Sequence, residues 1–250
     1  MTSAIPMDIA LFFVATLFGA VVAGVAGFAF GLVASAIWLH IISPAQSAPL
    51  IAAFAILIQG ATLWKLRHAI QISRLVPFVA GGAVGIPLGA AALTWTSPNQ
   101  MRAFIGAALI VFSLYSLARP TLPAAKGGAI ADSIVGVLSG AFSGSTGLAG
   151  IPVIVWASLR RWSKDDQRAV FQPVVVTVFV MTLIWFGGAG FITQDTLRLF
   201  WIGLPALAIG TWLGLQLYGR LDEATFRVVV LVLLLVSGIT LLPLPWSIAR

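Results

Sequence analysis

The chain contains no cysteine and carries little charge. None of its 250 residues is Cys, which excludes disulfides, thiolate metal sites and thiol catalysis. Only 8% of the residues are charged, against about 25% in an average soluble domain. So few charges cannot cover a globule that faces water, and 60% of the residues are hydrophobic, with a mean hydropathy of +1.07. The composition therefore indicates an integral membrane protein.

Basic residues outnumber acidic ones, with 14 Lys and Arg against 7 Asp and Glu, and the net charge is +7. They stand in short clusters between apolar segments. This pattern favours a role in orienting the chain in a bilayer over binding to nucleic acid. The residues before Met7 include no Lys or Arg, so we expect the first apolar segment to be kept and not cleaved as a signal peptide.

Six apolar runs approach the roughly 20 residues that cross a bilayer; they are 48–64, 75–96, 102–118, 169–187, 197–218 and 224–242. Two more apolar regions, 7–42 and 130–159, are each interrupted by a glycine-rich motif. In the second region, the longer piece before the motif has only 14 residues, 130–143, or about 21 Å of helix. Each region is therefore either one kinked crossing or a re-entrant hairpin of two half-helices.

The placement of basic residues favours the hairpins. Eight crossings would divide the 14 basic residues as 7 and 7, whereas two hairpins and six crossings divide them as 11 and 3. Because cytoplasmic loops are enriched in Lys and Arg, the second arrangement agrees with the usual charge asymmetry. It places both termini outside and gives each half one hairpin and three transmembrane helices.

The sequence is also duplicated. Gly24 to Gly31 recurs 120 residues later as Gly144 to Gly150, and further matches follow at slightly larger spacing: Trp64 with Trp185, Gly85 with Gly210, Gly89 with Gly214, and Arg102 with Arg227. Because each half has an odd number of crossings, the second half is inverted relative to the first, as in many secondary transporters. The predicted fold class is an all-α integral membrane protein with an inverted-topology repeat. Its halves are 1–122 and 129–250, joined by a cytoplasmic linker at 123–128.

The motifs predict an anion site. A helix broken inside a membrane leaves backbone groups unpaired, and the second half-helix begins with free N–H groups and the positive end of its dipole. Two such starts, near Phe28 and Leu148, are predicted to meet near the midplane around a small anion. Candidate substrate-binding residues are Gly24, Gly27, Phe28, Gly31, Ser143, Gly144, Ser145, Thr146, Gly147, Gly150, Gln59 and Gln172. The alternative is that the glycines only permit tight helix packing and that the glutamines tie helices together.

Ionisable residues are nearly absent from the spans, which leaves little basis for catalysis, a metal or a cofactor. Asp132 is the only carboxylate near a hairpin start and is a weaker candidate for proton coupling. A basic patch at Arg160, Arg161 and Lys164 either gathers anions at the inner mouth or only determines topology.

At these motifs the chain resembles the sulfite exporter TauE/SafE family of bacterial membrane proteins. The matching features are Gly24-x-x-Gly27-Phe28 through Gly31, the run 143–152 and the run 163–169, within a likeness that covers about 15–245. The resemblance implies a bacterial inner membrane and the export of sulfite, sulfoacetate or related organosulfonates. The family commonly has consecutive glycines where this chain has bulkier residues, Phe28-Ala29-Phe30 and Leu148-Ala149.

We therefore expect a secondary transporter that exports a small sulfur-containing anion, and uniport is its simplest mechanism. The alternative is an anion channel or a membrane-assembly component without sulfonate transport. The expected partners are the anion and the lipid bilayer, with no nucleic acid; a homodimer is compatible with the sequence.

Overall fold

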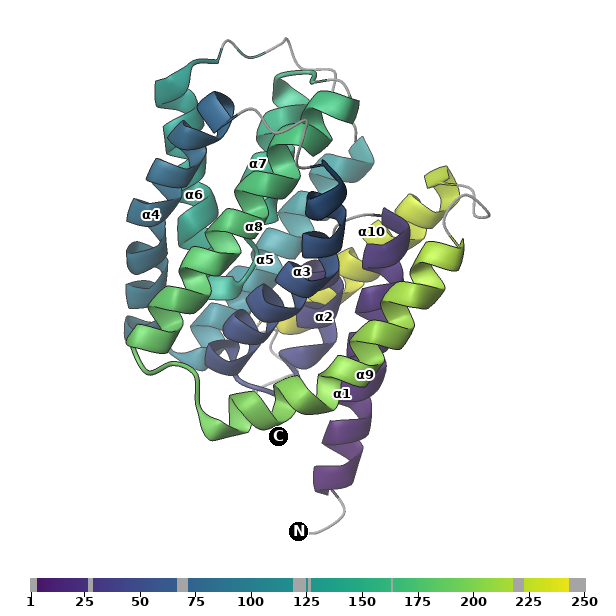
Figure 1. The fold of residues 1–250 in the computed structure, drawn as a ribbon. Coiled ribbons are helices and arrows are strands. Elements are labelled where there is room, and N and C mark those ends of the chain that lie inside the picture. The colour runs from purple at the N-terminus through teal and green to yellow at the C-terminus, as the bar shows by residue number, and fades with distance from the viewer. Residues whose placement is uncertain are drawn as a thin grey trace. The chain divides into compact units, whose positions relative to one another are not determined.

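The computed structural model of the chain describes residues 4–26, 29–66, 72–118, 125, 127–162, 164–217 and 223–242. Within these residues the regular structure is entirely helical, which confirms the all-α prediction (Figure 1). The helices are α1 (Ala4–Ala26), α2 (Phe30–Trp38), α3 (Pro44–Leu66), α4 (Ile72–Trp95), α5 (Pro98–Ala118), α6 (Ala129–Thr146), α7 (Gly150–Leu159), α8 (Lys164–Gly188), α9 (Gln194–Leu217) and α10 (Glu223–Leu241).

Among the described residues, five helices are long and apolar enough to cross a membrane. They are Met7–Val25, Ile72–Trp95, Pro98–Ala118, Ala169–Gly188 and Gln194–Leu217. The last four coincide with four of the six predicted crossings. The other two predicted crossings, 48–64 and 224–242, fall in α3 and α10, which carry shorter apolar stretches, Pro44–Gly60 and Val228–Leu241.

The outer faces of these helices suit lipid better than water. On α6, Ile130, Ile134 and Leu138 are exposed by 80%, 57% and 48%. These residues recur every four positions, so they form one apolar face of the helix. Contiguous apolar surface of this kind is unfavourable in water and is expected where a protein meets a membrane.

Two helices begin with the same local signal. Ser43 precedes Pro44 at the start of α3, and Ser97 precedes Pro98 at the start of α5. At each start the serine N–H donates to a glutamine Oε1 three residues later, over 3.2 Å to Gln46 and 3.0 Å at the second start. This is a capping box, and the proline in the first turn loses no helical hydrogen bond.

The first glycine-broken region is a hairpin with unequal arms. Its first arm, α1, has 23 residues, or about 34 Å of helix, and its return arm, α2, has 9. Trp38, at the end of α2, stacks on Phe12 with ring centroids 4.7 Å apart, so the return arm lies against α1. The chain folds back here into two helices, but the prediction of two half-helices is wrong for α1, which is long enough to cross a membrane. Its apolar residues continue through Gly19 and Gly24, which the helix accommodates without a break. The re-entrant topology stays a prediction.

The second region is also a hairpin. Its first arm, α6, has 18 residues, or about 27 Å of helix, because the helix continues beyond Ser143 to Thr146. The return arm, α7, has 10 residues. The Ser139 hydroxyl donates to the Ala149 carbonyl oxygen over 2.7 Å, so the start of α7 lies against α6.

The helices form two compact units, and each unit combines helices from both predicted halves. One unit comprises Met1–Ser47, Thr96–Pro120 and Gln194–Arg250, and the other comprises Ala48–Trp95 and Thr121–Thr193. In the first unit α1 packs along α9, and in the second α6 packs along α4. The hairpin of one half therefore packs on a helix of the other half. The predicted division into two repeats, joined by a linker at 123–128, stays a prediction.

Glycines let α4 and α6 pack backbone to backbone. They recur every four residues on both helices, so they form one face of each. A Cβ atom on any of them would meet backbone atoms of the other helix; the residues are Gly81, Gly85 and Gly89 on α4 and Gly136, Gly140 and Gly144 on α6. Small residues permit such close approach between membrane helices, which lack a hydrophobic driving force in lipid.

The equivalent contact in the other unit uses the duplicated positions. A Cβ at Gly24 of α1 would lie 2.9 Å from the Gly214 Cα atom of α9, and one at Gly210 would meet the Leu17 carbonyl oxygen. Gly24 corresponds to Gly144, and Gly214 corresponds to Gly89. The repeated glycines therefore build the same helix pairing twice, once within each unit.

We predict that Gly85→Ala lowers stability, whereas Gly60→Ala does not. A Cβ at Gly85 would collide with the Val137 carbonyl oxygen, but nothing lies within 4 Å of a Cβ at Gly60 in α3. Overpacking costs about 1–3 kcal/mol, whereas replacing a helical Gly by Ala gains about 1 kcal/mol. The measurement is the Tm of each purified variant in detergent. Equal Tm values for the two variants would contradict packing through Gly85.

Candidate functional site

The turn of the second hairpin requires glycine. Gly147 follows the last residue of α6 in the left-handed conformation, with φ of 76°, and its N–H donates to the Ser143 carbonyl oxygen over 2.9 Å. A Cβ at Gly147 would lie 2.9 Å from the Ala48 carbonyl oxygen and 3.0 Å from the Ile51 Cβ atom. Both the backbone conformation and the neighbouring helix α3 therefore exclude a side chain here.

The turn of the first hairpin uses alanine in the same conformation. Ala29 has φ of 79° and immediately precedes α2. A left-handed conformation costs a residue with a Cβ about 1–2 kcal/mol relative to the right-handed helix. Gly31 lies in the first turn of α2, whereas Gly27 and Phe28, the other predicted site residues of this turn, lie outside the described residues.

The predicted hydroxyl donors of the second hairpin already have hydrogen-bond acceptors within the protein. Thr182 donates to the Val178 carbonyl oxygen over 2.8 Å, so in the 2.7 Å contact between Ser143 and Thr182 the serine is the donor. Ser145 and Thr146 donate to carbonyl oxygens one turn earlier, over 2.7 and 2.6 Å. These hydrogens would have to leave their protein acceptors to reach an anion, and the role of the three residues as ligands stays a prediction.

Two of the predicted glycines lie in helix contacts. Gly24 packs on α9 and Gly144 packs on α4, as described above. For these two residues the alternative reading, tight helix packing, describes the observed contact. Gly150 differs, because it is the first residue of α7, and a Cβ there would lie 3.2 Å from the Phe171 ring of α8.

Both predicted glutamines are buried, with 7% exposure for Gln59 and 5% for Gln172. The Oε1 atom of each has no hydrogen-bond partner within the part of the chain that the structure describes. Leaving a buried polar group unsatisfied costs about 1–3 kcal/mol. Gln172 directly follows Phe171, whose ring lies against Gly150. Gln172 is therefore part of the segment of α8 that packs near the start of α7.

The sequence analysis overlooked one residue of this turn, Ser139. Its hydroxyl holds the Ala149 carbonyl oxygen immediately before α7. The first half has Gly19 at the corresponding position, so the duplication offers no signal for it. Only the spacing of four residues to Ser143 places Ser139 on the same face of α6.

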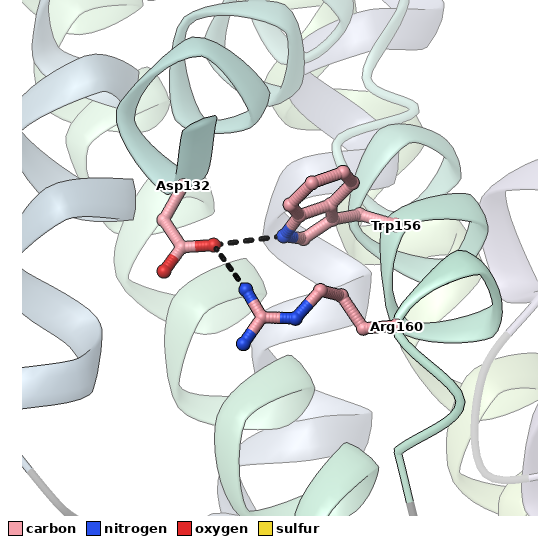
Figure 2. Close-up of polar contacts among 3 residues, drawn as sticks. All are labelled: Asp132, Trp156 and Arg160. Atoms are coloured by element: carbon pink, nitrogen blue, oxygen red, sulfur yellow. Dashed lines mark hydrogen bonds and ion pairs between the residues drawn. The ribbon is translucent and has the colours of Figure 1, made fainter. Parts of the chain in front are cut away.

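The open end of the second hairpin is closed by polar groups from both arms (Figure 2). The Trp156 Nε1–H of α7 donates to the Asp132 Oδ1 atom of α6 over 2.8 Å. The Arg160 Nη1 atom lies 3.7 Å from the same oxygen. Asp132 therefore joins the beginning of α6 to the end of α7 and does not lie at the turn between them.

The first hairpin is closed by aromatic packing and has a histidine beyond its end. His40 follows α2, and its Nε2 atom lies 3.3 Å from the Thr240 Oγ1 atom of α10. Partial burial, and then the positive charge of Arg102, lower the pKa of His40 below its usual value of 6.5. Both effects favour the neutral form of the histidine.

We predict opposite effects from exchanging glycine and alanine at the two turns. Ala29→Gly should gain about 0.5–1 kcal/mol of stability, because glycine adopts positive φ freely. Gly147→Ala should lose about 2–3 kcal/mol from the combined conformational cost and the contacts with α3. Thermal unfolding of the two purified variants measures both. A loss of stability in Ala29→Gly would contradict the conformation assigned to Ala29.

We also predict that acidification destabilises the protein through His40. The unfolded chain takes up a proton as the pH falls through about 6.5, whereas the folded chain binds it only at lower pH. Stability is therefore full above pH 6.5 and falls below it. The test measures Tm at pH 7.5 and at pH 5.5 for the parent and for His40→Gln. The decrease in Tm on acidification should be smaller in the variant. An identical decrease in both proteins would exclude His40 as the cause.

The fold and its turns define a class: a multi-pass α-helical membrane protein with two helical hairpins, each held in its unit by close glycine packing. A family model described as sulfite exporter TauE/SafE matches residues 11–241. The chain belongs to this family, which is a family of membrane transporters, and the resemblance seen in the sequence motifs is confirmed. Comparisons with curated proteins and with solved structures gave no match.

Proposed function

We propose that the protein exports a small sulfur-containing oxyanion, sulfite or an organosulfonate, from the bacterial cytoplasm across the inner membrane. Both termini would then lie outside. Membership of the family supports the transport of a sulfur anion. The observation that carries the proposal is the turn of the second hairpin, where a ten-residue helix begins at Gly150 and Phe171 of α8, the residue before the buried Gln172, lies against that start.

The start of α7 supplies attraction for an anion without a charged side chain. Helix N-termini carry about half a positive charge. Here the Ile151 N–H donates to the Leu148 carbonyl oxygen over 3.3 Å, and Pro152 has no N–H. Gly150 would therefore offer the backbone donor.

Gly150 has no Cβ atom. The nearest group over this face of the backbone is the Phe171 ring, with the Ile154 side chain slightly farther away. An anion that displaces this ring would reach the backbone directly, as at other helix N-termini that bind oxyanions.

Gln172 would provide the polar side chain of the site. Its amide is buried, and its Oε1 atom lacks a hydrogen-bond partner among the described residues, so this amide is not required to hold a helix through that oxygen. A side-chain amide offers two N–H donors that an oxyanion can accept. The amide N–H donors would then serve the ligand, whereas the Oε1 acceptor stays unsatisfied within the described part of the chain, at some cost in stability.

The first hairpin would contribute in the same manner, since it repeats the glycine packing of the second. The sequence predicts that the two starts face each other in an inverted repeat, and this arrangement remains part of the proposal. The membrane potential would drive export, because moving one negative charge outward is favoured by about 2.3 kcal/mol per 100 mV. Uniport needs no further coupling ion.

We predict that Gln172→Leu makes the protein more stable and less active. An apolar side chain of similar size removes the unsatisfied amide and should gain about 1 kcal/mol. The apparent affinity for sulfite should fall at least about tenfold, because the anion loses a donor. Tm in detergent and sulfite efflux from proteoliposomes under an imposed potential measure the two effects. Gln59→Leu tests the other predicted glutamine, in α3, by the same two measurements.

Several outcomes would contradict the proposal. A less stable Gln172→Leu variant with unchanged sulfite affinity would show that the amide only ties helices together. Efflux that requires a pH gradient and ignores voltage would exclude uniport. Currents far above transporter rates would indicate an anion channel, and the absence of any sulfite flux would remove the transport function.

A further inference from the structure

The ion pair between Arg160 and Asp132 is poorly matched. Their closest charged atoms are 3.7 Å apart, whereas hydrogen-bonded arginine–carboxylate pairs are about 2.7–2.9 Å apart. The short contact of this carboxylate goes to Trp156 instead, over 2.8 Å. The Arg160 Nη1 atom is buried and has no hydrogen-bond partner within the described residues. The arginine therefore has donor capacity that Asp132 does not use.

Arg160 is held in place by aromatic faces. Its guanidinium carbon lies 5.7 Å from the ring centroid of Trp156 and 5.6 Å from that of Trp162. Cation–π contacts of this kind fix a guanidinium without using its N–H donors. Gly127 leaves room for the group, because a Cβ there would collide with the Arg160 Nη1 atom. The side chain is thus positioned in advance, with its donors available.

The group can be reached from water. It lies at the open end of the second hairpin, where the Ala125 N–H donates to the Leu159 carbonyl oxygen over 2.9 Å. The side chains of Arg160 and Asp132 are 25% and 17% exposed. An ion in solution could therefore reach the exposed part of the Arg160 side chain, and the buried Nη1 atom would have to turn toward it to donate.

A charge pair is not needed to close a hairpin of this fold. The residue that corresponds to Asp132 in the first half is Phe12, 120 residues earlier, and it closes its hairpin by stacking on Trp38. Aromatic stacking needs no costly desolvation of charge, whereas a partly buried ion pair does. The polar closure of the second hairpin therefore suggests a role beyond stability.

We propose that Arg160 binds a small oxyanion at the mouth of the second hairpin, and that the Asp132 carboxylate holds the place of this anion when none is bound. An oxyanion can accept two guanidinium N–H bonds side by side, a geometry that Asp132 does not achieve. Asp132 keeps its bond to Trp156 when the anion arrives. The inference rests on the proposed function, in which this group receives the anion before it reaches the turn at Gly150.

Competition from Asp132 keeps the binding weak. A neighbouring carboxylate repels the anion and attracts the same arginine, so the anion is released easily. Weak binding suits a group on a transport path, where an ion must enter and also leave. The phosphate of an anionic lipid headgroup has the same chemistry, and the experiment distinguishes it from a soluble anion.

The test titrates sulfate into the full-length protein in neutral phosphatidylcholine nanodiscs at constant ionic strength. Trp156 and Trp162 are labelled with 5-fluorotryptophan, and their 19F resonances, assigned by single Trp→Phe variants, report on Arg160 locally. We expect saturable shifts in the parent and about three- to fivefold tighter binding in Asp132→Asn, which keeps the size of the side chain. Arg160→Gln should weaken binding at least about tenfold.

Arg161→Gln is the matched control, because it removes the same charge at the adjacent residue. Its sulfate affinity should change less than about twofold. Arg160→Lys should bind more weakly than the parent, since lysine keeps the charge but loses the bidentate fork. Tm values and the remaining 19F resonances identify any variant that does not fold.

Equal losses in Arg160→Gln and Arg161→Gln, or unchanged or weaker binding in folded Asp132→Asn, would overturn the inference. The same shifts produced by added phosphatidylglycerol, and competed by sulfate, would identify a lipid headgroup as the occupant of the anion site. The readout is independent of transport. Sulfate binding at Arg160 without sulfite flux would contradict the proposed function and leave this inference standing. Sulfite flux without sulfate binding at Arg160 would contradict this inference alone.

Discussion

The structure depends on close backbone contact between the long arm of each hairpin and one neighbouring helix. A helix that starts inside a membrane protein leaves backbone groups without partners, so its hairpin must be held by other contacts. In lipid the hydrophobic effect does not drive helices together, so close packing between small residues supplies these contacts. Glycines of α6 and α4 meet in this way, as do those of α1 and α9. The turns at Gly147 and Ala29 can therefore adopt left-handed conformations because the arms before them are firmly placed.

The two hairpins share this packing but differ at both ends. At the turns, one left-handed position is glycine and the other is alanine. At the open ends, Phe12 stacks on Trp38 in the first hairpin, whereas Asp132 joins α6 to Trp156 of α7 in the second. The first hairpin is closed by apolar contact, which responds little to ions. The second is closed by groups that an anion can compete for, so the duplicated halves are suited to different tasks.

Much of the fold follows from the sequence, because lipid imposes strong constraints. The apolar runs gave most of the spans, and the asymmetry of Lys and Arg distinguished hairpins from kinked crossings. The unequal arms did not follow, since a glycine such as Gly24 can break a helix or lie within one, and only the packing partner Gly214 decides. The site was harder to predict for the same reason. Nothing local to Ser143 reveals that Thr182, far along the chain, accepts its hydrogen bond.

The distribution of satisfied and unsatisfied polar groups has a consequence for selectivity. Hydroxyls that already donate to carbonyl oxygens, such as those of Ser145 and Thr146, do not add directional bonds to a ligand without first losing their own. In the proposed site, the anion would be left with the field of the helix start at Gly150 and the N–H donors of the Gln172 amide. These groups recognise negative charge and oxygen acceptors more than the shape of one molecule. Size would then be selected by the Phe171 ring, which lies against Gly150 and limits what can approach the backbone. A site built in this way favours small oxyanions as a class and holds each of them loosely enough to be released.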